Sequence, residues 1–435
     1  MKIALIDLKE SATGCNNKDK AGTFGNTSHG EDFVSKIYAM AKRSNVDVPV
    51  MHFGYMAAIF RQHGHEVTFY DAAPTKDEDL VILASSIVGY DEELEFVRKI
   101  RKPGRKIGFI NAFASARPEI FLEEADFVIK GEPEAATIKI AKGELDPKGA
   151  IESPLIVDLE SLPFPDWDGF PVQRYGYFPV LNKKPTISIL TSRGCSFNCS
   201  YCPYMVTQTE QWRRRSAKNV CDEIEYLQKK YGVKSLVFRD IMYTQSKKRA
   251  LEISEEIIKR AIKVEWSCET RADCLEEDTL RLLHKSGLRA IHLGIESPED
   301  DIVKKSGRIP IKESQQEKIV RLCDEIGIKI IAFFILGFTH DTPESIMKTI
   351  NYAKRLNAPL AQFDVMTPYP GTAFFDQIKD RIVDTDWKHY TTHHPVVKLD
   401  FLTAEQVLEF KNRAYREYYL RPSWIFKRAF QLLFS

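Results

Sequence analysis

Six strand-like segments alternate with helix-like segments in the second half of the chain, and this regular alternation restricts the fold more than any other feature. The apolar runs are short, and the stretches between them have the spacing of amphipathic helices. Six such βα units predict a barrel or partial barrel, whose chemistry belongs to the loops at the carboxyl ends of the strands. The predicted strands cover residues 186–191, 235–239, 264–269, 290–295, 329–336 and 361–366.

The first third of the chain also alternates, in the pattern of an open parallel sheet covered by helices. Residues 51–63 predict a helix that ends at Gly64. A polar loop between residues 10 and 31 is long enough to be functional or mobile. The predicted strands cover residues 2–8, 66–70, 80–84, 106–110 and 125–129.

A proline-rich passage, residues 147–185, separates the two alternating regions and predicts an extended linker without regular elements. Its aromatic side chains are expected to pack between domains rather than to bind a ligand. A chain of 435 residues suits two domains and a tail. The predicted α/β protein has a Rossmann-like domain at 1–145, a linker at 146–185, a partial (βα)6 TIM-like barrel at 186–400 and a C-terminal helical segment at 401–435.

The charges of the chain are balanced, with 62 Lys and Arg against 61 Asp and Glu, so no whole-molecule field attracts nucleic acid or an anionic membrane. Apolar residues make up 43% and charged residues 28%, which excludes a disordered, collagen-like or coiled-coil protein. The first residues lack the apolar region of a secretory signal, and no run approaches the roughly 20 apolar residues of a membrane span. The sequence therefore predicts a cytoplasmic protein that does not bind nucleic acid.

Three cysteines stand directly after the first predicted barrel strand: Cys195, Cys199 and Cys202. A structural zinc site needs four ligands, and no fourth thiol or imidazole follows within this loop. A cubane iron–sulfur cluster also takes four ligands, but three protein thiolates leave one iron open to a substrate or cofactor. The spacing therefore favours a catalytic cluster. The other five cysteines are scattered and are expected to be inert thiols in a reducing compartment.

The Cys-x3-Cys-x2-Cys loop, with the aromatic Tyr201 just before its last cysteine, resembles the loop of the radical S-adenosylmethionine (SAM) superfamily. The resemblance implies a [4Fe–4S] cluster whose open iron chelates the amino and carboxylate groups of SAM. An electron from the cluster then cleaves the sulfonium and yields a 5′-deoxyadenosyl radical. A zinc knuckle or a redox dithiol is the alternative interpretation of this loop.

Other strand ends strengthen the resemblance and imply which residues position SAM. Residues 294–297 read GIES and residues 368–372 read PYPGT, as in relatives. Asp240 stands where many relatives have a glycine-rich acidic motif for the SAM amino group, although the glycines are absent here. Each polar side chain could instead cap a helix or form a buried ion pair. The expected SAM contacts are Tyr201, Asp240, Glu269, Arg271, Glu296, Ser297 and Gly337.

The order of sheet domain, linker and barrel is similar to the radical SAM subfamily with an N-terminal cobalamin-binding domain. Residues 64–67 and 125–134 match phrases that are usual in that domain. The chain has no Asp-x-His-x-x-Gly motif, so no histidine is expected to ligate cobalt, and a domain that has lost the cofactor is the alternative. Ligands of open α/β sheets lie beyond the carboxyl ends of the strands. The implied cobalamin contacts are Ser85, Ser86, Asn111, Ala112 and Gly131.

The final segment, residues 421–434, sets aromatic and aliphatic side chains against basic ones. Such an amphipathic helix can lie peripherally at the inner membrane face, which would imply a lipid, an isoprenoid or another apolar substrate. The alternative is a terminal helix that docks on the barrel.

Together these features imply a radical SAM enzyme that abstracts hydrogen from an unactivated carbon, with cobalamin serving C-methylation, ring formation or rearrangement. The implied partners are a small-molecule or lipid-like substrate and an electron donor such as flavodoxin or ferredoxin. One alternative is a cobalamin-independent radical SAM enzyme whose first domain binds substrate. Another is a non-catalytic iron–sulfur scaffold or electron carrier. Methylthiolating relatives match poorly, because Cys15 is the only thiol of the first domain.

Overall fold

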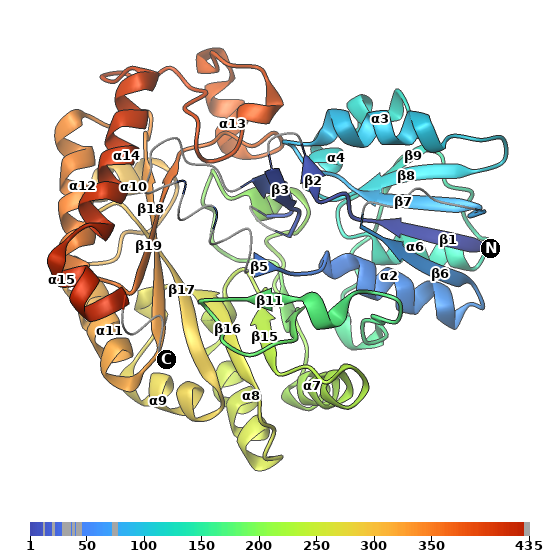
Figure 1. Cartoon of the computed structure of the whole chain (residues 1–435), viewed down its shortest axis with the longest axis horizontal. Helices are drawn as coiled ribbons and strands as arrows, with labels where there is room; N and C mark the ends of the chain where they lie inside the picture. Colours follow the sequence, from blue (N-terminus) through green and yellow to red (C-terminus); the bar gives the residue numbers. More distant parts are fainter. Residues whose placement is uncertain are drawn as a thin grey trace.

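The computed structural model describes residues 1–11, 14–19, 22–27, 36, 40, 46–71 and 77–429; for residues 10, 11, 14–16, 26, 27 and 429 it describes the backbone alone. Two six-stranded parallel sheets dominate the chain, one within its first 152 residues and one after residue 185. Figure 1 shows them side by side, the first sheet at the right and the second at the left. The polar loop predicted at residues 10–31 lies partly outside the described residues.

The first sheet has the strand order β10-β9-β8-β7-β1-β6. Its order reverses between β1 and β7, where open α/β sheets bind their ligands. Helices α2 and α6 pack together on one face, and α3 lies on the other (Figure 1). The strands are β1 (Lys2–Ile6), β6 (Glu66–Tyr70), β7 (Leu80–Ala84), β8 (Lys106–Ile110), β9 (Phe127–Lys130) and β10 (Gly149–Glu152). The helices are α2 (Met51–Gln62), α3 (Tyr90–Ile100), α4 (Ala112–Ala116), α5 (Pro118–Leu122) and α6 (Glu134–Ala141).

The second sheet follows the chain order, and its first and last strands pair with one neighbour each. The sheet therefore curls into a partial barrel that does not close. The predicted α/β fold and its six barrel strands are confirmed. The strands are β12 (Thr186–Ile189), β15 (Ser235–Phe238), β16 (Glu265–Thr270), β17 (Leu288–Glu296), β18 (Lys329–Leu336) and β19 (Leu360–Val365). The helices are α7 (Ala217–Tyr231), α8 (Lys247–Lys259), α9 (Glu277–Lys285), α10 (Asp300–Lys305), α11 (Glu313–Ile326), α12 (Pro343–Leu356) and α13 (Ala373–Ile378).

Helix α14 (Ala404–Tyr419) covers the open edge of β19 with tyrosine hydroxyls. The hydroxyl of Tyr419 donates to the carbonyl of Ala361 at 2.6 Å and accepts from its N–H at 3.0 Å. The hydroxyl of Tyr415 accepts from the N–H of Phe363 at 3.2 Å. An uncovered edge strand presents a row of unpaired backbone groups. The tyrosine hydroxyls form hydrogen bonds with part of the unpaired backbone groups of β19. The barrel can therefore stay open without another strand at this edge.

The C-terminal segment docks on the barrel as far as it is described, through α15 (Pro422–Trp424) and the π-helical η8 (Ile425–Ala429). Trp424 donates from its indole N–H to the carbonyl of Pro359 at 3.2 Å. Arg428 is buried and pairs with Asp324. Phe426, in contrast, is 84% exposed. The docked interpretation therefore holds for this part, and residues 430–434 of the predicted helix lie outside the described residues.

The passage between the sheets contains strands that the prediction of a featureless linker missed. β10 extends the first sheet, and β11 (Gly176–Tyr177) pairs antiparallel with β5 (Val46–Asp47). From β11 onward the passage packs against apolar side chains of the barrel strands. This second apolar cluster includes Tyr177, Val180, Leu181, Val237, Ala290, Ile331 and Leu360. The passage thereby closes the amino-terminal end of the barrel interior.

The segment after β1 forms three short antiparallel strands, β2 (Glu10–Ser11), β3 (Gly14–Asn17) and β4 (Asn26–Thr27), and carries two buried side chains between the sheets. The ammonium of Lys18 lies 2.9 Å from a carboxylate oxygen of Glu93 and donates to the carbonyl of Ala84 at 2.6 Å. The ring of Phe24 lies 4.6 Å from that of Tyr369, which follows β19. The segment therefore fills the place beside β7 where a ligand of the first sheet would be expected.

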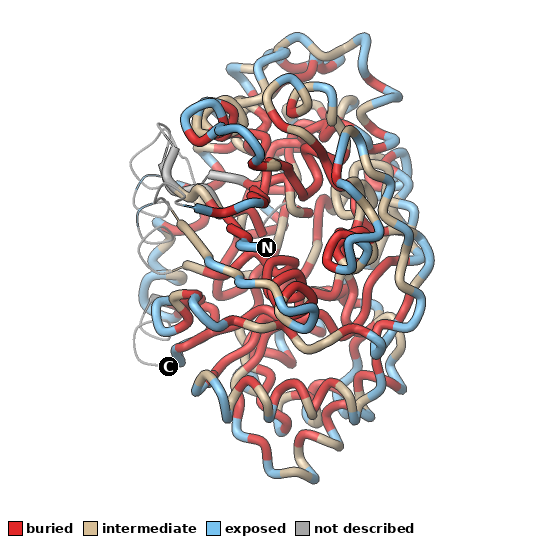
Figure 2. Tube along the Cα trace, turned by 90° about the vertical axis from the view of Figure 1, so that its right-hand side faces the viewer, coloured by how far each residue is buried: buried red, intermediate tan, exposed pale blue. Residues whose placement is uncertain are grey.

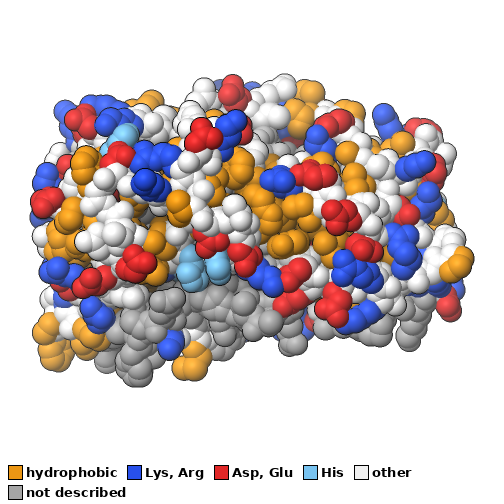
Figure 3. All heavy atoms as spheres, turned by 90° about the horizontal axis from the view of Figure 1, so that it is seen from above, with side chains coloured by type: hydrophobic (Ala, Val, Ile, Leu, Met, Phe, Trp, Pro, Cys, Tyr) orange, Lys and Arg blue, Asp and Glu red, His pale blue; other side chains and the backbone are white. Residues whose placement is uncertain are grey.

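Buried residues fill the interior of the molecule (Figure 2), and the face seen in Figure 3 carries basic and acidic side chains intermixed. This mixture fits the near-equal numbers of the two charges in the sequence. In the part of the chain that the structure describes, no helix combines the length and the apolarity needed to cross a bilayer.

Candidate active site

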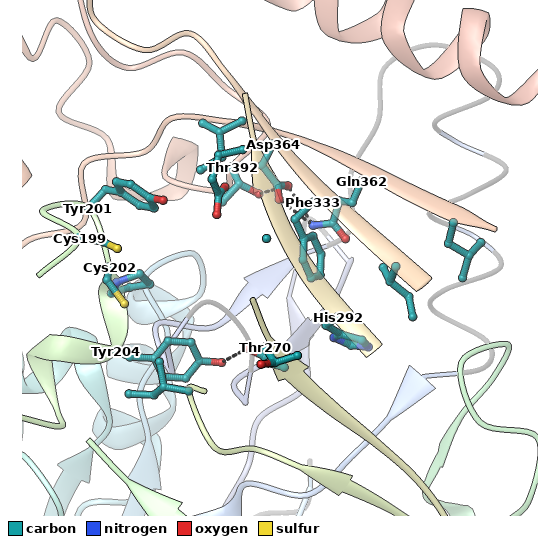
Figure 4. Close-up of a pocket in the computed structure, with 18 of the residues that line it drawn as sticks. Cys199, Tyr201, Cys202, Tyr204, Thr270, His292, Phe333, Gln362, Asp364 and Thr392 are labelled. Carbon is teal, nitrogen blue, oxygen red and sulfur yellow. Dashed lines mark hydrogen bonds between the residues drawn. The ribbon is translucent and has the colours of Figure 1, made fainter. Parts of the chain in front are cut away.

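A cavity of about 650 Å³ opens at the carboxyl ends of the barrel strands and continues into the barrel interior. Its volume lies in the range of small-molecule sites. Figure 4 shows side chains of the cysteine loop on one side of this space and side chains of β17, β18 and β19 on the other. The three predicted cluster ligands all line it: Cys195, Cys199 and Cys202.

The cysteine loop is fixed at its base and along its length. A two-stranded ladder of β13 (Ser192–Arg193) and β14 (Arg213–Arg214) closes the base. Gly194 has a φ of 84°, and a Cβ at this position would lie 2.3 Å from the carbonyl oxygen of Gln211, so only glycine fits. Further along, the N–H of Ser200 donates to the carbonyl of Ser306 at 3.0 Å. The cysteines therefore sit on a held loop.

Two of the three thiols are protonated as long as no metal is bound. Burial raises the pKa of Cys195 and raises that of Cys202 to about 12, so both are neutral thiols until a metal replaces their protons. Among the described residues, no three Cys, His, Asp or Glu side chains converge on one ion position. A cubane binds each thiolate through a different iron and needs no such convergence.

Glu269 lies near the end of β16 and belongs to a chain of polar contacts across the cavity mouth. Arg239 donates from Nη1 to Glu269 at 2.7 Å, and its Nε lies 2.9 Å from the carboxylate of Asp19. The hydroxyl of Tyr204 lies 3.5 Å from the second oxygen of Glu269. Burial raises the pKa of Glu269, and the guanidinium of Arg239 opposes that shift. The carboxylate can accept hydrogen bonds from a ligand at the strand ends.

Glu296 occupies a strained position at the end of β17, where the register with β18 shifts. Its φ is 64°, in the left-handed region that is costly for residues other than glycine. The bulge turns the carboxylate toward Arg308, whose Nη1 lies 3.2 Å away. Gly294 makes room for this pair, because a Cβ there would lie 2.8 Å from Arg308 Nη2. Burial raises the pKa of Glu296.

Arg271 follows β16 and keeps one donor unused. Its Nε and Nη2 bind the carboxylate of Asp273 at 3.0 and 2.7 Å, and its guanidinium lies 4.7 Å from the ring centre of Phe197 in the cysteine loop. Its Nη1 is buried and has no hydrogen-bond partner among the described residues. Leaving a buried donor unsatisfied costs about 1–3 kcal/mol, so an acceptor from a ligand is expected at this atom.

The predicted SAM contacts divide into two groups. Asp240 is fully buried and accepts three hydrogen bonds of 2.6–2.7 Å from residues 191 and 192. The hydroxyl of Ser297 accepts from the N–H of Glu299, and the N–H of Gly337 donates to a carboxylate in the following turn. None of these three lines the cavity. The residues that do line it are Tyr201, Glu269, Arg271 and Glu296.

The predicted cobalamin contacts lie together at the carboxyl edge of the first sheet, and only some of them offer anything to a ligand. The hydroxyls of Ser85 and Ser86 bind a backbone N–H and a carboxylate of the same sheet region. Ala112 begins α4. Among the described residues, the side-chain oxygen of Asn111 is buried without a hydrogen-bond partner, and a Cβ added at Gly131 would meet no atom nearer than 3.8 Å. An unused acceptor and open space are features that fit a ligand there.

Buried ion pairs connect the cysteine loop to the first sheet. Arg193, in the ladder below the cysteines, places Nη1 2.9 Å from Glu132 and Nη2 2.9 Å from Glu134, both just beyond β9. Arg213, on the facing strand, also binds Glu132, and His52 lies 2.9 Å from Glu134. Burial alone would raise the pKa of Glu134, but Arg193 and His52 lower it. The network fixes the base of the cysteine loop on the first sheet.

Sequence reasoning missed several cavity residues. Arg308 follows α10 and meets Glu296 only through the fold, so no local pattern identifies it. His292, Gln362 and Asp364 lie on the strands and line the interior (Figure 4). A signal for them exists, because a polar residue at every second position of an otherwise apolar strand indicates an inward polar face.

Comparisons of the sequence with known proteins agree with this geometry. The profile of the radical SAM superfamily matches residues 189–353. An uncharacterized methyltransferase of Pyrococcus horikoshii is 30% identical over 423 residues, which cover 88% of this chain and 90% of that protein. The anaerobic magnesium-protoporphyrin IX monomethyl ester cyclase of Rubrivivax gelatinosus is 31% identical over 280 residues, which cover 62% of this chain and 48% of the cyclase.

A solved structure matches the fold of both sheets. The radical SAM methyltransferase TsrM from Kitasatospora setae superposes with a TM-score of 0.66 over 88% of this chain and 78% of that one, at 16% sequence identity. The match supports the order of a Rossmann-like domain before a partial barrel.

Proposed function

Because this chain belongs to the radical SAM superfamily, we propose that it abstracts hydrogen from an unactivated carbon of a small molecule. The observation that carries the proposal is that Cys195, Cys199 and Cys202 line a cavity at the mouth of the partial barrel. They stand on a loop whose base is closed by the β13–β14 ladder. Cys195, Cys199 and Cys202 would hold a [4Fe–4S] cluster, which would supply the electron for cleavage of SAM into methionine and a 5′-deoxyadenosyl radical.

We assign SAM to the space between the cysteine loop and the ends of β16 and β17. Arg271 would direct its unused Nη1 at an acceptor of the ligand, such as a carboxylate oxygen. Glu269 and Glu296 would accept hydrogen bonds from its amino or ribose hydroxyl groups. Tyr201, whose ring lies 6.4 Å from that of Phe338, would close the cavity beside the cluster. The ion pairs of both glutamates hold their carboxylates in place before the ligand arrives.

We further propose that cobalamin binds at the carboxyl edge of the first sheet and supplies a methyl group for C-methylation, or serves ring formation or rearrangement. TsrM was solved with cobalamin and a [4Fe–4S] cluster bound, and the two sequence relatives are named a methyltransferase and a cyclase. Asn111 and Gly131 provide the unused acceptor and the space. A cobalamin-independent enzyme is the second candidate, favoured by the internal pairing of Ser85 and Ser86.

The substrate that we propose is apolar, such as a lipid or an isoprenoid-like molecule, because aromatic and aliphatic side chains form much of the cavity wall. An electron donor of the flavodoxin or ferredoxin type would reduce the cluster.

The test is anaerobic reconstitution followed by assays for iron, sulfide and 5′-deoxyadenosine. We expect a cluster and SAM cleavage in the parent protein and neither in the variant with Cys195, Cys199 and Cys202 all replaced by Ala. Cys274→Ala, which removes a half-buried thiol outside the cavity lining, is the matched control and should behave as the parent does. Retained 5′-deoxyadenosine formation in the triple variant would reject the proposal. A corrin absorption spectrum of the purified protein separates the two cobalamin candidates.

A further inference from the structure

The cysteine loop reaches the molecular surface beside the end of α10. Between the cysteines, Ser196 and Asn198 are exposed. The N–H and the hydroxyl of Ser200 both donate to the carbonyl of Ser306, each at 3.0 Å. A Cβ at Gly307 would lie 2.6 Å from the carbonyl oxygen of Asn198, so the two segments are in direct contact. The turn that follows α10 is therefore a part of the surface directly beside the cluster ligands.

The side chains around this turn are basic. Lys304 and Lys305 end α10, Lys312 stands just before α11, and all three are exposed. The ammonium of Lys304 lies 3.8 Å from the carboxylate of Asp301. Lys305 and Lys312 form no ion pair within the part of the chain that the structure describes. These two ammonium groups remain available to a partner.

Two acidic side chains close to these lysines in the sequence are paired with cations of α12. Glu313, which begins α11, binds Arg355, and Glu299, which precedes α10, lies 3.0 Å from Lys348. The acidic first turn of α10 thus adjoins α12, whereas its basic last turn adjoins the cysteine loop. The surface beside the loop therefore has an excess of positive charge.

An apolar side chain stands among the lysines. Ile309 is 60% exposed, and Arg271 donates from Nη2 to its carbonyl at 3.1 Å. The same guanidinium binds Asp273, and the neighbouring Arg308 pairs with Glu296, so these charges are balanced within the protein. An apolar centre with a polar rim is the usual composition of a protein–protein contact.

We call the surface formed by Lys304, Lys305, Ile309 and Lys312 the basic turn, and we propose that it docks a flavodoxin-type electron donor, a small acidic protein that carries a flavin. Opposite charges on two surfaces steer their encounter and fix their orientation. Complexes of electron-transfer proteins are weak and need only a small interface. A flavin is favoured over an iron–sulfur carrier because the exposed edge of its ring system is apolar and suits Ile309.

This inference rests on the proposed function, because it locates the partner that supplies the electron for SAM cleavage. In the docked complex, one electron passes from the reduced flavin to the oxidised cluster. The flavin is oxidised by one electron and the cluster is reduced by one, while no bond forms or breaks and no proton moves.

A binding titration tests the basic turn on the anaerobically reconstituted protein. The probe is fluorescently labelled flavodoxin, and its anisotropy gives the Kd. We expect the Kd to rise about three- to tenfold in Lys305→Glu and at least about tenfold when Lys304, Lys305 and Lys312 are all replaced by Glu, because like charges then face the acidic partner. An unchanged Kd in the triple variant would overturn the proposal.

Lys285→Glu is the matched control. Like Lys305, Lys285 is the exposed last residue of a helix and forms no ion pair among the described residues. Helix α9 leads from the end of β16 to the start of β17, so Lys285 lies at the amino end of the barrel, away from the cysteine loop. Its substitution should leave the Kd unchanged. A loss equal to that of Lys305→Glu would indicate an effect of net charge and would overturn the assignment to the basic turn.

Two further comparisons sharpen the choice of partner. Raising the ionic strength from about 0.02 to about 0.5 M should weaken binding to the parent and remove most of the difference between the parent and the triple variant. Ile309→Ser should raise the Kd for flavodoxin about threefold or more, because it removes the apolar contact. Tighter binding of a ferredoxin than of flavodoxin to the parent would overturn the choice of a flavin carrier.

Dithionite separates this inference from the proposed function, because in excess it reduces a cluster without docking. The triple variant should form 5′-deoxyadenosine as fast as the parent with dithionite, and at least about fivefold more slowly with limiting reduced flavodoxin. Turnover with dithionite in a protein that does not bind flavodoxin would reject the docking site and leave the radical chemistry standing. Flavodoxin binding that the triple variant loses, in a protein that forms no 5′-deoxyadenosine with dithionite, would support the docking site and reject the radical chemistry.

Discussion

The carboxyl ends of the first sheet and those of the barrel carry similar polar residues but differ in what those residues bind. At the barrel ends, Arg271 keeps a buried donor unused, and Glu296 lines a cavity. At the end of β7 in the first sheet, Ser86 donates to Glu93, and Glu93 binds the buried ammonium of Lys18. The polar groups described at the carboxyl edge of the first sheet are therefore mostly hydrogen-bonded within the chain. Those at the carboxyl ends of the barrel strands include groups that still need partners.

This difference shows that position in an α/β fold does not by itself make a binding site. Both edges lie where ligands of parallel sheets are expected. In the first sheet, the segment that carries Lys18 occupies the point where the strand order reverses, and of the five predicted cobalamin contacts Asn111 and Gly131 alone retain unused features among the described residues. In the barrel, the open seam and the incomplete interior layer leave a cavity. Whether the protein's own side chains occupy a carboxyl edge therefore decides whether that edge is open to a ligand.

The strongest test of the link between the two edges is Arg193→Met. Removing this guanidinium takes one partner from each of the buried carboxylates Glu132 and Glu134, which keep Arg213 and His52, and should lower the unfolding free energy by up to about 3–5 kcal/mol. Urea denaturation measures this loss, and iron retention under a chelator reports the cysteine loop. Arg98→Met is the control, since its pair with Glu124 is exposed and should matter by less than about 1 kcal/mol. Equal effects of the two variants would contradict the role of the network.

Glu93→Gln tests whether the charges of Glu93 and Lys18 occupy the carboxyl edge of the first sheet. Burial, opposed by Lys18, raises the pKa of Glu93 from 4.5 to about 7. The folded state thus binds this proton more tightly than the unfolded state. The contribution of Glu93 to the free energy of unfolding is complete below pH 4.5. It falls by about 3 kcal/mol as the pH rises to 7 and does not change above that pH.

The variant should flatten this part of the pH dependence of the unfolding free energy, measured by urea denaturation between pH 4 and pH 8. Glu95→Gln on the same helix is the control, because Glu95 is exposed and pairs with the exposed Lys99. A slope that survives in Glu93→Gln would place the titrating group elsewhere.

Arg271→Met tests the unused donor of the barrel edge. A hydrogen bond from a guanidinium to a charged acceptor contributes about 1.5–3 kcal/mol, so the Kd for SAM should rise roughly 10- to 100-fold. Calorimetric titration of the reconstituted protein with SAM measures this change. Arg281→Met, which removes an exposed guanidinium from α9, should leave the Kd unchanged. An unaltered Kd in Arg271→Met would mean that Nη1 faces no ligand.

The smallest effect is expected for Asn111→Gly at the first edge. Asn111 has a φ of 87°, which glycine adopts without strain, and its side-chain oxygen has no partner. The variant should therefore be as stable as the parent or more stable by about 1 kcal/mol. If cobalamin binds at this edge, its absorption in the purified protein should fall. A clearly destabilised variant would show that the side chain serves the fold rather than a ligand.

Much of this architecture could be predicted from the sequence because its signals are local. Apolar runs and helical spacing identify strands and helices from neighbouring residues alone. The Cys-x3-Cys-x2-Cys spacing likewise identifies the cluster loop, since its ligands stand close together in the chain. β10 was missed because its short run, residues 149–152, stands among prolines and pairs only with a strand formed far earlier.

The surroundings of Asp240 could not be predicted in this way. It stands at a strand end, as the family pattern requires, yet its carboxylate turns back to Thr191 and Ser192. Arg308, which no motif marks, instead supplies the partner of Glu296. The direction of a side chain at a strand end depends on bulges and on neighbours from other strands, which the sequence does not display.

Local sequence patterns were enough to establish an α/β chain of two parallel sheets with a three-thiol loop beside the first barrel strand, because periodicity and ligand spacing are properties of adjacent residues. The folded chain was needed to show which strand ends stay available to a ligand, how the ion pairs of Arg193 hold the cysteine loop, and where the barrel remains hollow. Those features arise from contacts between residues far apart in the chain, and such contacts exist only once the packing is complete.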